Sequence, residues 1–300
     1  MKRLLLMTML GLAAATGAQA ASVLDSAEAL WKYDAAEAGG VSVGQITDSS
    51  GNGHNASSVV QPGSATLNWT TSPAQSPVGF DAVDLFTDHG RALEFNKAIE
   101  TNSDVSSAGY TVNGFMLSGS ATLVTRLRWD GQIGNTRSWL YSNGGAVNGW
   151  LFGIASNSQL TVYQHTTTYD TIATNLPALK PGQWYDVAVV IRDDVESAQA
   201  TDTFTFYMVG PDGKFYSQTR DRGTLYNGTV TTGNTLVGGE SLGTGTSNQT
   251  KGFDGALDHL AVWDTALTDA QVRSLLIPTP AALPAGLMLI GLTAMRRRRH

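Results

Sequence analysis

The most informative stretch of the chain reads Gly252-Phe253-Asp254-Gly255-Ala256-Leu257-Asp258-His259-Leu260-Ala261-Val262-Trp263, followed two residues later by Ala266-Leu267-Thr268-Asp269-Ala270-Gln271-Val272. The apolar pattern of the first segment predicts a strand over Ala256–Trp263. In the second segment, Thr268 and Gln271 form a capping box, with Leu267 and Val272 placed as its hydrophobic staple. We therefore predict a long strand followed directly by one short helix, which ends before Pro278.

Alternation of apolar and polar residues with a period of two dominates the rest of the chain. Turn sequences such as Lys180-Pro181-Gly182 and Pro211-Asp212-Gly213 separate the alternating segments. Short strands without intervening helices predict an all-β, antiparallel two-sheet sandwich or jelly roll in one domain, residues 21–277. The expected strands are Ala92–Phe95, Ala121–Trp129, Arg137–Ser142, Gly149–Ala155, Gln159–Gln164, Trp184–Arg192, Thr203–Val209, Lys214–Thr219 and Thr235–Val237.

The N-terminus has the pattern of a secretory signal peptide. Lys2 and Arg3 are followed by an apolar segment from Leu4 to Ala15, and Ala18-Gln19-Ala20 supplies the small residues that a signal peptidase needs. We expect residues 1–20 to be removed on export.

The C-terminus, residues 278–300, has the pattern of a sorting signal. An apolar run of 13 residues, Leu283 to Met295, precedes four arginines, and it is shorter than the roughly 20 residues of a comfortable transmembrane helix. With its motif Pro278, Pro280 and Ala281, this tail resembles the PEP-CTERM class, in the variant that opens Val-Pro-Leu-Pro-Ala. The resemblance implies a processing peptidase of the exosortase type, membrane attachment before processing, and the surface of a Gram-negative bacterium. A plain membrane anchor is the alternative.

Composition excludes several classes of function. The two ends hold six of the 19 basic residues and none of the 25 acidic ones, so the body between them has a formal net charge of −12. Nucleic-acid binding needs clustered Lys and Arg and is therefore not expected. The absence of cysteine excludes disulfides and thiolate chemistry.

Two segments carry a second resemblance. The N-terminal one comprises Ala29-Leu30-Trp31-Lys32-Tyr33-Asp34 and Asp48-Ser49-Ser50-Gly51-Asn52-Gly53-His54-Asn55-Ala56, and the C-terminal one is the stretch 252–272. Both are similar to the ends of LamG-like, concanavalin A-like jelly-roll domains. The resemblance implies that the first and last strands lie side by side, with the short helix at one end. It also implies that Asp258 helps to hold a structural calcium ion against the loop at Asp48.

The residues themselves leave the calcium site open. Asp48 and Asn52 offer oxygen ligands among glycines, as a hard cation requires. Strand parity places Asp258 on the apolar face of Ala256, Leu260 and Val262, where a carboxylate needs a metal or hydrogen bonds. The alternative is an Asx-turn at 48–53 and an aspartate that caps backbone amides.

Evidence for catalysis is weak. Gly239-Glu240-Ser241-Leu242-Gly243 has the spacing of a nucleophile elbow, but a loop-like sequence follows it instead of a helix. No glutamate has an acidic residue two positions later, as a glycosidase strand would.

The aromatic residues Trp139, Tyr141, Trp150 and Tyr163 could stack on sugars or fill the core. We therefore expect a non-catalytic exported protein that binds glycan, exopolysaccharide or extracellular matrix. A carbohydrate-active enzyme or an esterase using Ser241 is the alternative.

Overall fold

The structure is a computed structural model. It describes residues 22–33, 45–59, 66–70, 92–96, 109–131, 137–144, 149–165, 169–193, 202–222, 235–239 and 252–277. The predicted signal peptide, the sorting tail and Ser241 lie outside these ranges. None of the helices in the described part of the chain is long and apolar enough to cross a bilayer.

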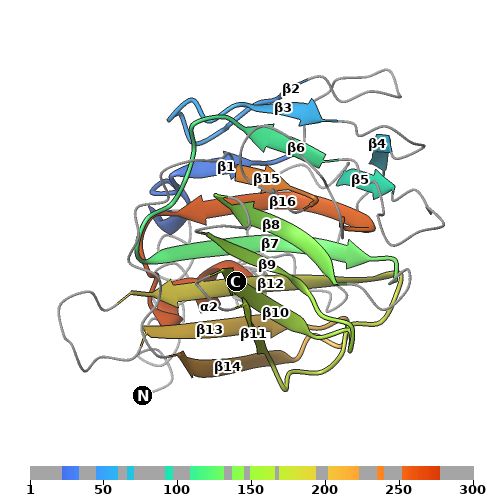
Figure 1. Cartoon of the computed structure of the whole chain (residues 1–300), viewed down its shortest axis with the longest axis vertical. Coiled ribbons are helices and arrows are strands. Elements are labelled where there is room, and N and C mark those ends of the chain that lie inside the picture. Colours follow the sequence, from blue (N-terminus) through green and yellow to red (C-terminus); the bar gives the residue numbers. More distant parts are fainter. Residues whose placement is uncertain are drawn as a thin grey trace, which may run out of the picture.

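Two antiparallel sheets form a sandwich (Figure 1). Sheet A contains, in spatial order, β14 (Phe215–Arg222), β13 (Asp202–Val209), β12 (Gln183–Arg192), β7 (Ala121–Trp129), β16 (Gly255–Trp263), β5 (Ala92–Asn96) and β4 (Thr66–Thr70), and β1 (Ala29–Trp31) also pairs with β16. Sheet B contains β11 (Tyr169–Ala173), β10 (Leu160–His165), β9 (Trp150–Ile154), β8 (Ser138–Asn143), β15 (Thr235–Val237), β6 (Gly109–Val112), β3 (Ala56–Val59) and β2 (Gln45–Ile46). The predicted all-β sandwich is confirmed.

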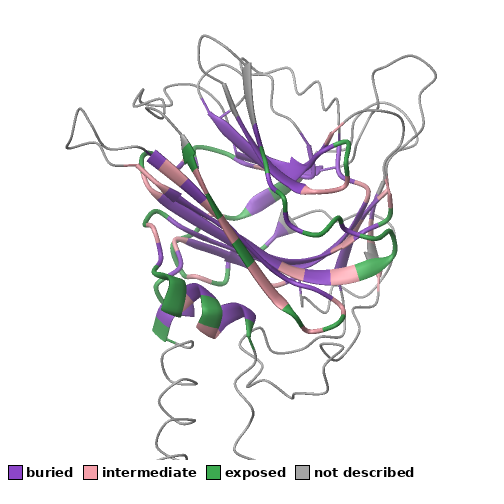
Figure 2. Ribbon diagram, turned by 90° about the horizontal axis from the view of Figure 1, so that it is seen from below, coloured by how far each residue is buried: buried purple, intermediate pink, exposed green. Residues whose placement is uncertain are grey.

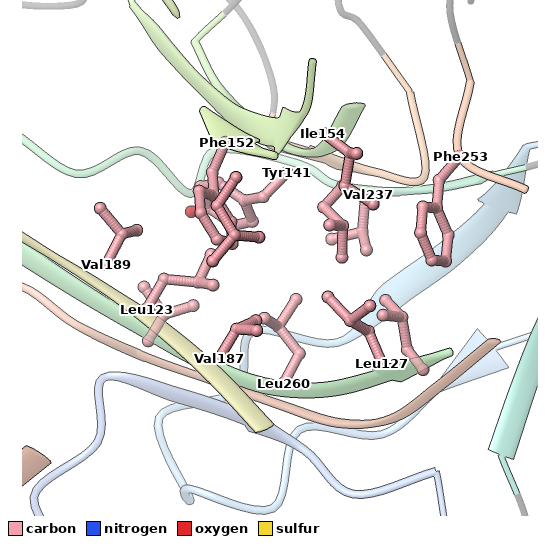
Figure 3. Close-up of a cluster of buried hydrophobic side chains, with 14 of the residues drawn as sticks. Leu123, Leu127, Tyr141, Phe152, Ile154, Val187, Val189, Val237, Phe253 and Leu260 are labelled. Carbon is pink, nitrogen blue, oxygen red and sulfur yellow. The ribbon is translucent and has the colours of Figure 1, made fainter. Parts of the chain in front are cut away.

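The core lies between the inner faces of the sheets (Figure 3). Alternate residues of β7 and β12, such as Leu123, Leu127 and Val187, point from sheet A toward sheet B. They meet side chains of sheet B and of the segment before β16, among them Phe152, Ile154, Val237 and Phe253. Because side chains alternate between the two faces of a strand, the period of two in the sequence produces this layer directly.

The first and last strands pair as expected. β1 runs antiparallel to β16, with Ala29 opposite Val262 and Trp31 opposite Leu260. The backbone N–H of Glu28 extends this ladder by donating to the carbonyl of Val262. Strands from the two ends of the described body therefore lie side by side in sheet A.

The predicted helix forms as α2 (Asp269–Leu276). Thr268 accepts from the backbone N–H of Gln271, whose side chain accepts from the N–H of Thr268, so the capping box is confirmed. Val272, Leu275 and Leu276 are buried against the outer face of sheet A, where they cluster with Val124 and Trp263. Figure 2 shows the short helix outside the two layers, with its exposed residues turned outward.

A β-bulge in β16 corrects the expected orientation of Asp258. Leu257 pairs with Leu127 and His259 pairs with Arg126, so one extra residue is accommodated at this point. Ala256 consequently lies on the outer face opposite Arg128, whereas Leu260 and Val262 face the core. Strand parity cannot be extended through a bulge, and the three residues do not share one face.

Several short strands were missed. The segments β2, β3, β4, β6 and β11 are at most five residues long. Sequences such as Ala56-Ser57-Ser58-Val59 carry little apolar alternation, so pairing with neighbouring strands and not local pattern makes them strands.

Candidate functional site

The loop at Asp48 is a closed hydrogen-bonded unit. One carboxylate oxygen of Asp48 accepts from the backbone N–H groups of Leu30 (3.0 Å) and Ser50 (2.9 Å). The other accepts from the Ser50 hydroxyl (2.8 Å) and from the backbone N–H of His54 (2.9 Å). Burial alone would raise the pKa of Asp48, but these donors together hold it below its ordinary value.

These contacts do not fit a calcium ligand. Four donors occupy the roughly four lone-pair positions of the Asp48 carboxylate, and Asn52 directs its amide N–H groups at the carbonyls of Ala27 and Glu28. Within the described ranges, no three His, Cys, Asp or Glu side chains gather closely enough to hold a metal ion. The hydrogen bonds at Asp48 are those of an Asx-turn attached to β1, which was the alternative to a calcium site. Calcium binding itself stays a prediction.

Asp48 and Asp258 are separated by a strand. The N–H and C=O groups of Leu30 bond to the loop at residues 48–49 on one side of β1, while β16 pairs with its other side. Asp258 lies in the bulge of β16, buried, with a carboxylate oxygen 3.9 Å from a guanidinium nitrogen of Arg126. Arg126 also lies 3.0 Å from Asp186 on β12. The structure thus places Asp258 in a buried ion cluster and not beside Asp48.

The four aromatic candidates divide into two pairs. Tyr141 and Trp150 stack on each other inside the core, with ring centroids 5.2 Å apart. Their rings contribute to packing and are closed to an external ligand.

Trp139 and Tyr163 form the second pair, on the outer face of sheet B. Their ring centroids are 5.6 Å apart, and they cluster with Leu151. A Cβ at Gly153 would lie 2.8 Å from the Trp139 ring, so glycine leaves the space for that indole. Arg137 lies over both rings, and they are only 1% and 7% exposed. This pair could contact a sugar only if the side chains became more accessible.

A row of directly paired residues crosses the outer face of sheet A, and sequence reasoning missed it. Through four successive pairings, Asn68 on β4, Glu94 on β5, Ala256 on β16, Arg128 on β7 and Trp184 on β12 lie side by side. We call these five residues the outer-face row. They come from segments far apart in the chain, so their neighbourhood depends on strand register and not on any local motif.

Arg128 organises this row. Its guanidinium bonds to both oxygens of Asp130 (2.8 and 2.6 Å) and reaches past Ala256 to Glu94 (2.8 Å). The hydrogen bond to Asp130, followed by that to Glu94, raises the pKa of Arg128, against the lowering effect of its partial burial. The guanidinium also lies 5.8 Å from the ring centroid of Trp184. These side chains remain reachable, since Arg128, Glu94 and Asp130 are 19%, 26% and 31% exposed.

Arg128 brings two carboxylates to one guanidinium, Glu94 from the row and Asp130 from the end of β7, which the search along single strands could not find. Glu94 and Asp130 contact one guanidinium from two sides. Glycoside hydrolysis needs two carboxyl groups that flank the scissile bond, whereas Glu94 and Asp130 are both directed at one guanidinium.

Comparison with known proteins agrees with the architecture. The model of a laminin G family described as the concanavalin A-like lectin/glucanases superfamily matches residues 100–273. Domain 4 of AbnA, a GH43 extracellular arabinanase from Geobacillus stearothermophilus solved in complex with arabinotriose, is 14% identical, with a TM-score of 0.51 over 84% of this chain and 98% of that one. The CBM40 domain of the Ruminococcus gnavus IT-sialidase, bound to α2,6 sialyllactose, is 14% identical, with a TM-score of 0.44 over 62% of this chain and 96% of that one. No curated protein matches the chain in sequence.

Proposed function

The chain belongs to the concanavalin A-like lectin/glucanase superfamily, and we propose that it is an exported protein that binds glycan without cleaving it. The observation that carries this proposal is the pairing of the outer-face carboxylates with arginines. Glu94 and Asp130 hold Arg128, while Asp186 and Asp258 lie beside Arg126. The exposed part of this surface, Arg128 with Glu94 and Asp130, offers donors and acceptors to the hydroxyl groups of a sugar, while its acids are engaged by an arginine.

Two further observations support binding. The arabinanase domain that shares this fold was solved with an oligosaccharide. The charge of the body, −12 between the two end segments, favours a soluble surface protein over a nucleic-acid binder.

The two ends support the cellular part of the proposal. A signal peptide at residues 1–20 would direct export, and a tail of the PEP-CTERM type at residues 278–300 would direct sorting at the cell surface. The partner would then be a polysaccharide of the cell's own surface or surroundings. An exosortase-type peptidase would recognise Pro278, Pro280 and Ala281 before it removes the apolar segment.

One experiment separates binding from cleavage. The protein produced from the full-length chain is tested on immobilised polysaccharides for retention, and on the same polysaccharides for release of reducing ends. We expect retention without release. Release of reducing ends above the level of a heat-inactivated sample would show an enzyme instead.

Mass spectrometry of the mature protein tests export independently. The expected N-terminus is Ala21 or Ser22, and the expected C-terminus lies near Pro278–Ala281. A product that still begins at Met1 and ends at His300 would contradict both signals.

A further inference from the structure

The outer-face row has the composition of a binding surface. Trp184 at one end is partly exposed, and so is Asn68 at the other. Four strand spacings of about 4.8 Å separate these ends, so the row is about 19 Å long. That length exceeds a single sugar ring and suits an oligosaccharide lying across the strands.

The row has an aromatic end and a polar middle. The indole of Trp184 offers an apolar surface for the C–H groups of a sugar ring. The Arg128 guanidinium lies over one face of this ring, 5.8 Å from its centroid, and is held by Asp130 and Glu94, so its direction is set before any ligand arrives. Ala256, between Arg128 and Glu94, has a small side chain that is fully buried, and Arg128 reaches past it to Glu94. Fixed donors and acceptors beside one aromatic ring are typical of small-ligand sites.

The part of the same face nearest α2 is already used. The next row toward α2 contains Arg126 and Asp186, which form an ion pair. Beyond it, Val124, Ala188 and Ala261 form the apolar band that α2 and the segment 23–30 cover. The outer-face row therefore lies outside the part of this face that α2 and the segment 23–30 cover.

Charge selects the class of ligand. Around the row there are four acidic side chains, Glu94, Asp130, Asp186 and the buried Asp258, against two basic ones, Arg126 and Arg128, a formal net charge of −2. The local net charge is negative, and both arginines are already ion-paired. A uronic or sialic acid would bring another carboxylate to this surface and be repelled.

We infer that the outer-face row is the glycan-binding site and that it takes neutral oligosaccharides. This inference rests on the proposed function and adds to it the site and the chemistry of the ligand.

Affinity electrophoresis tests the inference with arabinan, xylan and galactan as neutral probes and with polygalacturonate and alginate as acidic ones. The wild type should be retarded by at least one neutral probe and by neither acidic one. Trp184→Ala should weaken that retardation by about tenfold, the loss expected for an aromatic contact. Trp184→Tyr, which keeps a ring, should recover part of it.

Phe215→Ala is the matched control. Phe215 is an aromatic residue outside the row, two strands beyond Asp186 on the same sheet, and its ring centroid lies 4.0 Å from the Arg273 guanidinium of α2. Its loss should leave binding unchanged. Hydroxyl-radical footprinting of the wild type needs no variant: bound probe should protect Trp184 from oxidation.

The outcomes are distinguishable. If the wild type binds none of the probes, the proposed function and the inference both fail. If it binds and Trp184→Ala binds equally well, or Trp184 gains no protection, glycan binding stands and the assigned site is wrong. If polygalacturonate binds as tightly as the neutral probes, the charge argument is overturned.

Discussion

Replacing Asp48 by asparagine tests the hydrogen-bonded loop most sharply. The change keeps the shape of the side chain but turns one carboxylate oxygen into an amide N–H₂ group. Two of the four donors, either Leu30 and Ser50 N–H or Ser50 O–H and His54 N–H, then lose their acceptor. Each lost hydrogen bond to a charged group costs about 1.5–3 kcal/mol before relaxation. We expect a loss of about 3 kcal/mol in the free energy of unfolding.

For a domain of this size, that loss corresponds to a melting temperature lower by about 6–12 °C. The assay is thermal and urea unfolding at neutral pH, with Asp25→Asn as the control. Asp25 lies exposed in the same N-terminal segment, and its replacement should change stability by less than about 0.5 kcal/mol. If the two variants are equally stable, the reasoning about Asp48 is refuted.

The same pair of proteins gives a pH test with a definite sign. The pKa of Asp48 is lower in the folded than in the unfolded state. Its contribution is therefore present above the unfolded pKa, about 3.9, and is lost as the pH falls through the folded pKa. The stability gap between wild type and Asp48→Asn should narrow on acidification. A melting temperature that is higher with calcium than with a chelator would support the calcium prediction, and the same melting temperature in both would contradict it.

Three further predictions concern the fold. Gly255 has φ +147°, and a Cβ there would lie 2.0 Å from the carbonyl oxygen of Arg128. Gly255→Ala should therefore lower the free energy of unfolding in urea far more than Gly182→Ala. A Cβ at Gly182 would meet no atom within 4 Å, and that change should cost about 1 kcal/mol. Thr268→Ala removes the capping box of α2 and should cost about 1 kcal/mol in the same assay, whereas Thr268→Ser should restore it. Burial raises the pKa of the Tyr33 and Tyr110 hydroxyls, so stability should fall as the pH rises above about 10, where unfolded tyrosine ionises; phenolate absorbance that reaches its full value before unfolding would contradict this.

Much of the fold could be predicted because its signals are local. Alternation along β7 and β12 predicted both strands to within one residue, and the capping box at Thr268 predicted the start of α2. The pairing of the first and last strands followed from the resemblance of the two end segments and was confirmed by the register of Ala29 with Val262.

The candidate sites were harder to predict. Tyr141 and Trp150 pack in the core and Trp139 faces outward, although all lie in one group of strands. The glycines at 51 and 53 predicted a tight turn. The sequence did not predict that four hydrogen-bond donors would occupy both oxygens of the Asp48 carboxylate. Acids from separate segments that contact the same arginine, such as Glu94 and Asp130, could not be found by spacing along a single strand.

By itself, the sequence determined that this chain forms short strands with one apolar face, has a capped helix after the last of them, and lacks cysteine chemistry, because periodicity, capping and composition can be read without knowing which segments meet in space. Only the tertiary structure decided what those strands present to a ligand. One extra residue at the bulge of Asp258 exchanges the two faces of β16, and strand register sets Asn68, Glu94, Ala256, Arg128 and Trp184 side by side. Register depends on how the whole core packs, so no local segment of the chain encodes it.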